Sequence, residues 1–196
     1  MNVAIVDYKA GNIYSVIHAL ERLGVSPLLT DNPELIAKAD KVLFPGQGEA
    51  GNAMRYLKQH GLDRVIRELH QPLLGICIGQ QLLCSHSEEG DVDCLGIFDV
   101  PVLRFRPQQH EDKVPHMGWN TIGQTRSPLF RGFEGNEFVY FVHSFYVPEC
   151  EWTVATTDYI QPFSAALRRD NFYATQFHPE KSGEAGERIL QNFLNL

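Results

Sequence analysis

The chain has 196 residues, of which 43% are hydrophobic, and its formal net charge at pH 7 is −7. A chain of this length buries a sizeable core, and we expect one domain over 1–196. The acidic balance argues against a nucleic-acid-binding protein, because phosphate backbones require basic surfaces. No apolar stretch in the sequence is as long as a membrane-spanning helix, and residues 1–7 lack the basic start of a secretory leader. We therefore expect a cytoplasmic protein.

The first half of the chain alternates short apolar segments with amphipathic ones. In chain order these predict a strand over 3–8, a helix over 12–23, a strand over 25–30, a helix over 33–39, a strand over 41–44, two helices over 50–69 and a strand over 73–76. The helix over 12–23 carries Ile13, Val16 and Leu20 on one stripe and stops at Gly24. Such alternation predicts a parallel sheet with helices on both faces.

The second half consists of short apolar segments bounded by turns. It predicts strands of a mixed or antiparallel extension over 100–103, 120–122, 138–141, 152–155 and 172–175, and a final helix over 184–194. The acidic stretch 87–91 is typical of a solvated loop. The expected fold class is α/β: a central, largely parallel sheet flanked by helices, with a smaller antiparallel extension.

The four cysteines are Cys77, Cys84, Cys94 and Cys150, and none forms a C-x-x-C pair. In a reducing compartment we expect no disulfides. Cys84, His86 and Cys94 could be imagined as metal ligands, but their spacing fits no standard zinc pattern. We instead expect Cys84 in the core, on the helix that follows Cys77.

A possible nucleophile lies between two glycines in the segment 75–79, Gly-Ile-Cys-Ile-Gly. It follows an apolar strand and precedes a helix-like run, which is the arrangement of a strand–turn–helix nucleophile elbow. The glycines permit the close approach of strand and helix that such a turn requires. A thiol at a helix N-terminus is stabilised as the thiolate, the form that attacks carbonyls. The alternative is that Cys77 is a small buried hydrophobic residue.

A base and a carboxylate stand far downstream in the segment 176–180, Gln-Phe-His-Pro-Glu. Pro179 fixes the backbone between His178 and Glu180. With Cys77 these residues can form a cysteine hydrolase triad, in which Glu180 orients the imidazole. The alternative is a polar turn before the last helix.

Two backbone donors are expected beside the thiol. Gly46, Gln47 and Gly48 follow a predicted strand, and sites in open α/β sheets form at the carboxyl ends of strands. This loop can aim N–H groups at a developing oxyanion, and the N–H of Ile78 would supply the second donor. The alternative for the loop is an ordinary strand-to-helix turn.

Three aromatic or histidine residues have no assigned role on these grounds. His143 is predicted to be a hydrogen-bonded structural histidine. His116 and Trp119 are individually typical of structural residues. Together, between Pro115 and Asn120, they could form an exposed contact for a partner.

These segments together resemble the class I glutamine amidotransferases, nearly from end to end. The resemblance is carried by the elbow, the Gln-Phe-His-Pro-Glu segment and four further stretches: Asp7-Tyr8 with Gly11-Asn12, and 45–48, 115–120 and 140–145. Residues 115–120, Pro-His-Met-Gly-Trp-Asn, are similar to the branch that serves histidine biosynthesis. The resemblance implies one glutamine amidotransferase type-1 domain over 1–196.

The resemblance also implies roles for individual residues. Cys77 would be the nucleophile, His178 the general base and acid, and Glu180 its orienting group. Gln81, with the backbone of Ser144 and Phe145, would hold the α-amino and α-carboxylate groups of glutamine. Three positions depart from the commonest family pattern, namely Lys9, Gln47 and Phe145. Gln47 bears on how the oxyanion loop is gated, and Phe145 lacks a hydroxyl that relatives often have.

The function that the resemblance implies is hydrolysis of L-glutamine through a cysteine thioester, without metal or organic cofactor. The ammonia would pass to a (β/α)8 cyclase, HisF, bound as a heterodimer through a face that includes Trp119 and Lys181. Imidazole glycerol phosphate and aminoimidazole carboxamide ribonucleotide would result. The alternatives are the glutaminase subunit of a paralogous amidotransferase, such as one in a surface-sugar pathway, and a non-catalytic regulatory binding module.

Overall fold

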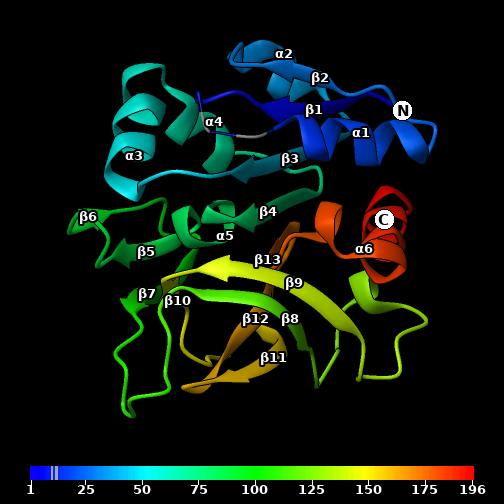
Figure 1. The fold of residues 1–196 in the computed structure, drawn as a ribbon. Coiled ribbons are helices and arrows are strands. Elements are labelled where there is room, and N and C mark those ends of the chain that lie inside the picture. The colour runs from blue at the N-terminus through cyan, green and yellow to red at the C-terminus, as the bar shows by residue number, and fades with distance from the viewer. Residues whose placement is uncertain (10, 12) are drawn as a thin grey trace.

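The computed structural model describes residues 1–9, 11 and 13–196 (Figure 1). Asn12, where the first helix was expected to start and which is part of one family-like segment, lies outside the described residues. The helices are α1 (Tyr14–Arg22), α2 (Pro33–Lys38), α3 (Ala50–Gln59), α4 (Leu62–Arg67), α5 (Ile78–Leu82) and α6 (Gly183–Leu194), with 3-10 turns η1 (Pro128–Phe130) and η2 (Pro179–Lys181). No helix in this described part is long and apolar enough to cross a membrane.

The central sheet has seven strands in the order β11-β12-β13-β4-β3-β1-β2 (Figure 1). Five of them run parallel: β1 (Val3–Val6), β2 (Leu28–Thr30), β3 (Lys41–Gly46), β4 (Leu73–Cys77) and β13 (Phe172–Thr175). β11 (Thr153–Tyr159) and β12 (Gln161–Arg169) extend the sheet as antiparallel strands. This arrangement confirms the predicted α/β fold with a largely parallel sheet and an antiparallel extension.

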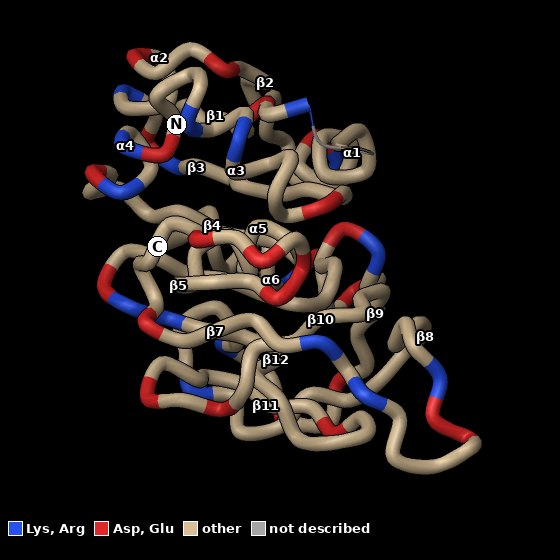
Figure 2. The backbone as a smooth tube through the Cα atoms, turned by 90° about the vertical axis from the view of Figure 1, so that its left-hand side faces the viewer, with Lys and Arg blue, Asp and Glu red and all other residues tan. Residues whose placement is uncertain are grey.

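Two smaller sheets complete the structure. One is a mixed sheet of β10 (Phe145–Tyr146), β7 (Phe98–Arg104), β5 (Cys84–Ser87) and β6 (Val92–Asp93), in which β5 and β7 are parallel. The other is an antiparallel ribbon of β8 (His116–Thr121) and β9 (Phe138–His143). Charged residues of both signs are scattered over the helices and loops that surround these sheets (Figure 2).

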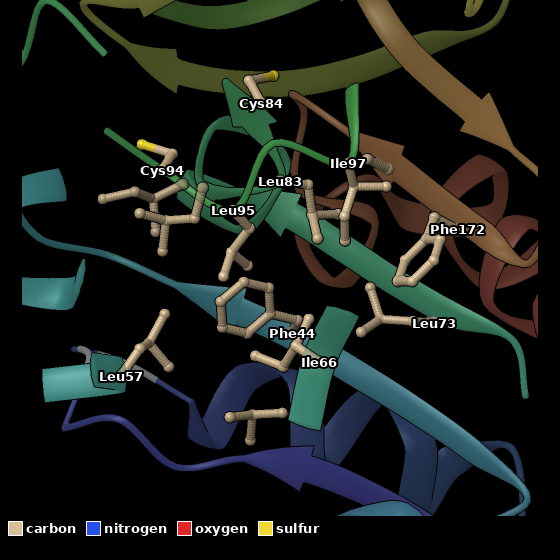
Figure 3. Close-up of a cluster of buried hydrophobic side chains, with 14 of the residues drawn as sticks. Phe44, Leu57, Ile66, Leu73, Leu83, Cys84, Cys94, Leu95, Ile97 and Phe172 are labelled. Carbon is tan, nitrogen blue, oxygen red and sulfur yellow. The ribbon is translucent and has the colours of Figure 1, made fainter. Parts of the chain in front are cut away.

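The core has two halves because successive strand residues point to opposite faces of the sheet. Phe44 and Leu73 face one half, where they meet Ile66 of α4 and other residues from α2 and α3 (Figure 3). Leu43 and Leu74 face the other half, which α1 and α6 cover. Each fully buried apolar side chain of this size contributes roughly 1.5–3 kcal/mol relative to an exposed one. Both faces of the strands are thereby buried, as parallel sheets require.

The structure differs from the expected strands and helices at three places. The segment 172–175 was expected in the mixed or antiparallel extension, but as β13 it pairs in parallel with β4 in the central sheet. Cys84 lies in strand β5 rather than on the helix after Cys77, because α5 ends at Leu82 and the next residues pair with β7 and β6. Cys84 is nevertheless fully buried, as expected. Strand β12 was missed because Pro162 near its start is unfavourable in a central strand. Its pairing with β11 and β13 outweighs that local signal.

Candidate active site

Cys77 occupies a strained turn at the carboxyl end of β4. Its φ of 55° and ψ of −108° place an L-residue in a sparsely populated region, which costs about 1–3 kcal/mol. The flanking glycines allow this turn. A Cβ on Gly79 would come within 1.8 Å of the Phe44 carbonyl oxygen of β3, and one on Gly75 within 2.9 Å of Gly79. The sequence therefore forms the predicted strand–turn–helix elbow, with the thiol directly before α5.

The Gly46–Gly48 loop lies beside this elbow. Gly46 is the register partner of Cys77 across the parallel pair β3 and β4. Gly48 has a φ of 139°, which favours glycine, and the Gln47 carbonyl accepts a hydrogen bond from the Gly11 N–H at 3.1 Å. The ring of Tyr8 lies so close to Gly46 that a Cβ there would overlap its hydroxyl. The loop is thus held close to the thiol by the adjacent strand.

His178 and Glu180 reach the same edge of the sheet from β13. This strand is the parallel neighbour of β4, with Thr175 paired to Ile76 (Figure 1). His178 Nδ1 lies 2.7 Å from Glu180 Oε1, and both side chains are almost completely buried. The Ser182 hydroxyl donates to the His178 carbonyl at 2.6 Å and accepts from the Tyr140 N–H at 2.9 Å. The imidazole is therefore fixed both at its ring and at its backbone.

Cys77 and His178 line one cavity of about 440 Å³, and Glu180 reaches it only through its contact with His178. The cavity also contacts Gln47, Gly48, Ile78, Gln81, Glu89, Pro115, Tyr140, Val142, His143, Ser144, Phe145 and Lys181. The structure thus brings together nearly all of the predicted site residues. Gly46, Glu180 and Trp119 are not among the lining residues. Trp119 is 55% exposed on β8, with its ring 6.0 Å from that of Tyr140.

The electrostatics of the site favour a protonated His178. Burial lowers the pKa of His178, but the neighbouring Cys77 sulfur and Glu180 carboxylate outweigh burial and raise it to about 10. His178 Nε2 is buried and makes no hydrogen bond within the described residues, and Cys77 Sγ is 3.9 Å from the Val142 carbonyl oxygen. The thiol and the imidazole therefore interact through charge without a formed hydrogen bond. Catalytic hydrogen bonds are often long before the substrate binds.

A sequence model of the family described as "Glutamine amidotransferase class-I" matches residues 4–196. The chain belongs to this family. Two relatives named "Imidazole glycerol phosphate synthase subunit HisH" support the assignment. The one from Bacteroides thetaiotaomicron is 67% identical over the full length of both chains. The one from Idiomarina loihiensis is 48% identical, and the match covers 100% of this chain and 98% of the relative.

Solved structures agree with the amidotransferase assignment at the level of the fold. A putative GMP synthase protein from Thermoplasma acidophilum superimposes with a TM-score of 0.76 over 100% of this chain and 92% of that one, at 19% identity. PurLQS from Thermotoga maritima gives a TM-score of 0.71 over 99% and 97% of the two chains, also at 19% identity. The fold is therefore shared well beyond recognisable sequence identity.

The amidotransferase site contains a carboxylate that the sequence did not indicate. Glu89 was expected on a solvated loop, but it lines the cavity and accepts the Ala50 N–H at 3.0 Å. Burial raises the pKa of Glu89, and the nearby Glu49 raises it too, while the Ala50 hydrogen bond lowers it. No sequence signal distinguishes Glu89 from Glu88, because the turn between β5 and β6 determines which of the two side chains lines the cavity.

Two histidines of the amidotransferase form a buried pair. His143 Nε2 lies 3.1 Å from His116 Nδ1, and His143 Nδ1 lies 2.7 Å from the Phe145 carbonyl oxygen. Burial lowers the pKa of His143 to about 3 and that of His116 to about 4. His143 is thus a hydrogen-bonded structural histidine, as predicted. Within the residues that the structure describes, no cluster of three or more His, Cys, Asp or Glu side chains could hold a metal ion.

Proposed function

We propose that this chain is the glutaminase subunit of an imidazole glycerol phosphate synthase. The observation that carries the chemical part is a cysteine elbow that shares one cavity with His178, whose ring is paired with the buried Glu180 carboxylate. The pathway is supported by full-length relatives at 65–67% identity that bear the name of this synthase's HisH subunit. The expected overall reaction is hydrolysis of the side-chain amide of L-glutamine to glutamate and ammonia.

In the first half of the reaction, the Cys77 thiolate attacks the amide carbon of glutamine. The carbonyl π electrons move to oxygen, and the Ile78 N–H with an N–H of the Gly46–Gly48 loop stabilises the oxyanion. His178, protonated at Nε2, then donates its proton to the leaving nitrogen as the C–N bond breaks. Ammonia departs, and a thioester links the substrate carbonyl to Cys77.

In the second half, a water molecule attacks the thioester. His178 accepts the proton from water at Nε2, and the same backbone donors stabilise the second tetrahedral intermediate. The C–S bond then breaks, which releases glutamate and restores the thiolate beside a protonated imidazole. Glu180 keeps Nδ1 protonated throughout, so Nε2 is the atom that exchanges the proton.

We infer that the polar lining of the cavity recognises the amino-acid end of glutamine. Gln81 uses its amide nitrogen to donate to Phe145 and Gln176, so its oxygen is the end able to accept from an ammonium group. The Glu89 carboxylate offers a charge of opposite sign to the same group. The backbone of Ser144 and Phe145 is proposed to hold the α-carboxylate.

A partner is required if the ammonia is to be used. In water near neutral pH, free ammonia is converted to ammonium, which is not a nucleophile. We therefore propose a heterodimer with the cyclase HisF, docked over the cavity mouth. Lys181 lines the cavity, and Trp119 stands exposed on β8 against the cavity residue Tyr140. Exposed aromatic residues beside a functional opening are common anchors for a partner.

The proposal is tested by separating ammonia production from ammonia use. Cys77→Ala in the reconstituted complex should abolish synthesis from glutamine but retain synthesis from ammonium salt at alkaline pH. His178→Ala should behave similarly, and Glu180→Ala should lose less, because it orients the base. Cys150→Ala, which alters a thiol outside the cavity, is the matched control. Glutamine-dependent synthesis at near-wild-type rate by Cys77→Ala would exclude the covalent mechanism.

A further inference from the structure

Gln176 is a completely buried side chain that bridges two members of the site. Its Oε1 accepts a hydrogen bond from Gln81 Nε2 at 3.0 Å, and its Nε2 lies 3.7 Å from Cys77 Sγ within hydrogen-bonding geometry for sulfur. A buried amide of this kind must satisfy its polar atoms locally. Gln176 therefore has a contact with the reacting sulfur that the mechanism above does not use.

The orientation of the Gln176 amide follows from its neighbours, although oxygen and nitrogen ends of an amide are similar in shape. The Phe145 carbonyl oxygen can only accept, so the Gln81 group that lies 3.1 Å from it must be the NH2 end. The same NH2 group reaches Gln176, which must present its oxygen there. The NH2 end of Gln176 is then left facing Cys77.

The Phe145 carbonyl oxygen, which determines the orientation of both amides, accepts a second hydrogen bond from His143. His143 Nδ1 lies 2.7 Å away and must carry the proton, since a carbonyl cannot donate. In the neutral ring His143 Nε2 is then an acceptor, and His116 Nδ1 donates to it at 3.1 Å. Two buried donors therefore converge on one carbonyl, and the arrangement of Gln81 and Gln176 is fixed from strand β8 to the thiol.

We propose that Gln176 is a further catalytic residue, which donates a hydrogen bond from Nε2 to the Cys77 sulfur and stabilises it as the thiolate. This inference deepens the proposed function and rests on it. A donor to the charged form of an acid favours ionisation, whereas the thiol form gains less from the same contact. Ionisation gives up the long thiol contact with the Val142 carbonyl oxygen at 3.9 Å, and the proton lost by the thiol resides on His178.

The proposal implies a trade-off in reactivity. A lower pKa gives more thiolate near neutral pH, but each thiolate becomes a weaker nucleophile, with a Brønsted coefficient of about 0.4–0.5. For a shift of about one pKa unit, the roughly tenfold gain in thiolate is offset by a factor of about three. The net advantage is therefore about threefold, and it exists only at pH values below the thiol pKa.

The test measures the pH dependence of Cys77 alkylation by iodoacetamide, without glutamine, in the isolated chain. The Cys77 peptide is followed by mass spectrometry, so reaction at other cysteines does not interfere. Gln176→Met keeps the size of the side chain and removes the donor, and Gln176→Glu replaces it with a carboxylate. The control is Thr175→Val at the neighbouring residue. It removes a buried hydrogen bond to the Phe177 carbonyl oxygen and does not alter a contact with the sulfur.

Other titratable groups around the thiol remain unchanged in these variants. They are His178 with Glu180, Tyr8, His143, Glu89 and Lys181. We expect Gln176→Met to move the alkylation midpoint upward by about one pH unit, which is about tenfold less thiolate below it. Gln176→Glu should move the midpoint further in the same direction, because a carboxylate repels the thiolate. Thr175→Val should leave it in place.

A midpoint equal to that of wild type in folded Gln176→Met and Gln176→Glu would overturn the proposal. An equal shift in Thr175→Val would also overturn it, because the effect would then belong to packing. If Gln176→Met does not fold, Gln176→Asn, which is one methylene shorter and cannot reach the sulfur, takes its place. Because no glutamine is turned over, a failure of this proposal is distinct from a failure of the glutaminase assignment, which only a turnover assay reports.

Discussion

Replacing Gly79 with alanine tests whether the close approach of α5 to β3 is essential to the elbow. A Cβ at this position would lie 1.8 Å from the Phe44 carbonyl oxygen. A carbon and a carbonyl oxygen need roughly 3.3 Å, so helix and strand must separate by about 1.5 Å. The carbonyl belongs to the backbone of a central strand and cannot rotate away as a side chain would. Cys77 must move with the helix that it precedes.

The effect of Gly79→Ala on the free energy of unfolding combines two opposing contributions. Overpacking of a buried contact costs about 1–3 kcal/mol, and the immobile backbone places this site at the upper end. The higher helix propensity of alanine offsets about 1 kcal/mol. The free energy of unfolding should therefore fall by about 2 kcal/mol, which for a chain of this size lowers Tm by roughly 4–8 °C. A displacement of this size at the nucleophile should also reduce kcat/KM about 100-fold.

Thermal unfolding by circular dichroism and glutaminase assays of the reconstituted complex would measure both effects. Gly123→Ala is the matched control, because its Cβ would meet only Thr156 Oγ1 at 3.9 Å and its φ is ordinary. We expect its free energy of unfolding to change by no more than about 0.5 kcal/mol. If Gly79→Ala unfolds at the wild-type temperature and keeps its activity, the close approach is not what requires glycine.

Three further predictions follow from the site. The isolated chain should hydrolyse glutamine slowly until the cyclase and its nucleotide ligand are added. Steady-state assays with and without these two additions would measure the difference. Full glutaminase activity of the isolated chain would contradict the prediction. Trp119→Ala and Lys181→Ala should weaken the affinity for the cyclase in titration calorimetry, whereas Leu28→Ala on edge strand β2 should not. Unchanged affinity in the first two variants would refute the assignment of Trp119 and Lys181 to the partner-binding face. Finally, burial lowers the pKa of His178 but its charged neighbours raise it to about 10, so its protonation stabilises the fold fully below pH 6.5 and progressively less up to pH 10. Glu180→Gln should therefore be less stable than wild type in urea at pH 7, with a smaller difference near pH 10; a constant difference would argue against the pairing.

The sequence was sufficient where a local pattern dictates geometry. The two glycines around Cys77 predicted an elbow, and the residues found there adopt one. The spacing of His178 and Glu180 around a proline predicted a paired imidazole and carboxylate, which lie 2.7 Å apart. The alternation of the first half predicted the parallel sheet. In each case a local sequence pattern was enough to indicate the feature.

The sequence was insufficient where distant segments meet. Glu89 lines the cavity because β5 and β6 pair. Glu88, the residue before it, has the same side chain but does not line the cavity. Gln176 contacts Cys77 across 99 positions of sequence, through the adjacency of β13 and β4. Cys84 was assigned to a helix because its local pattern continues that of α5, whereas its pairing with β7 makes it a strand. These properties arise from tertiary contacts, which override local propensity.

The strand order has a consequence for how the chain acquires its chemistry during synthesis. Cys77 at the end of β4 and Gln176 just after β13 are in contact but lie 99 positions apart along the polypeptide. At translation rates of about 5–20 residues per second, the elbow leaves the ribosome roughly 5–20 s before the strand that carries its base. During that interval Cys77 has no imidazole beside it. The arrangement of thiol, imidazole and buried amide at this edge of the sheet is therefore complete only when β13 docks beside β4.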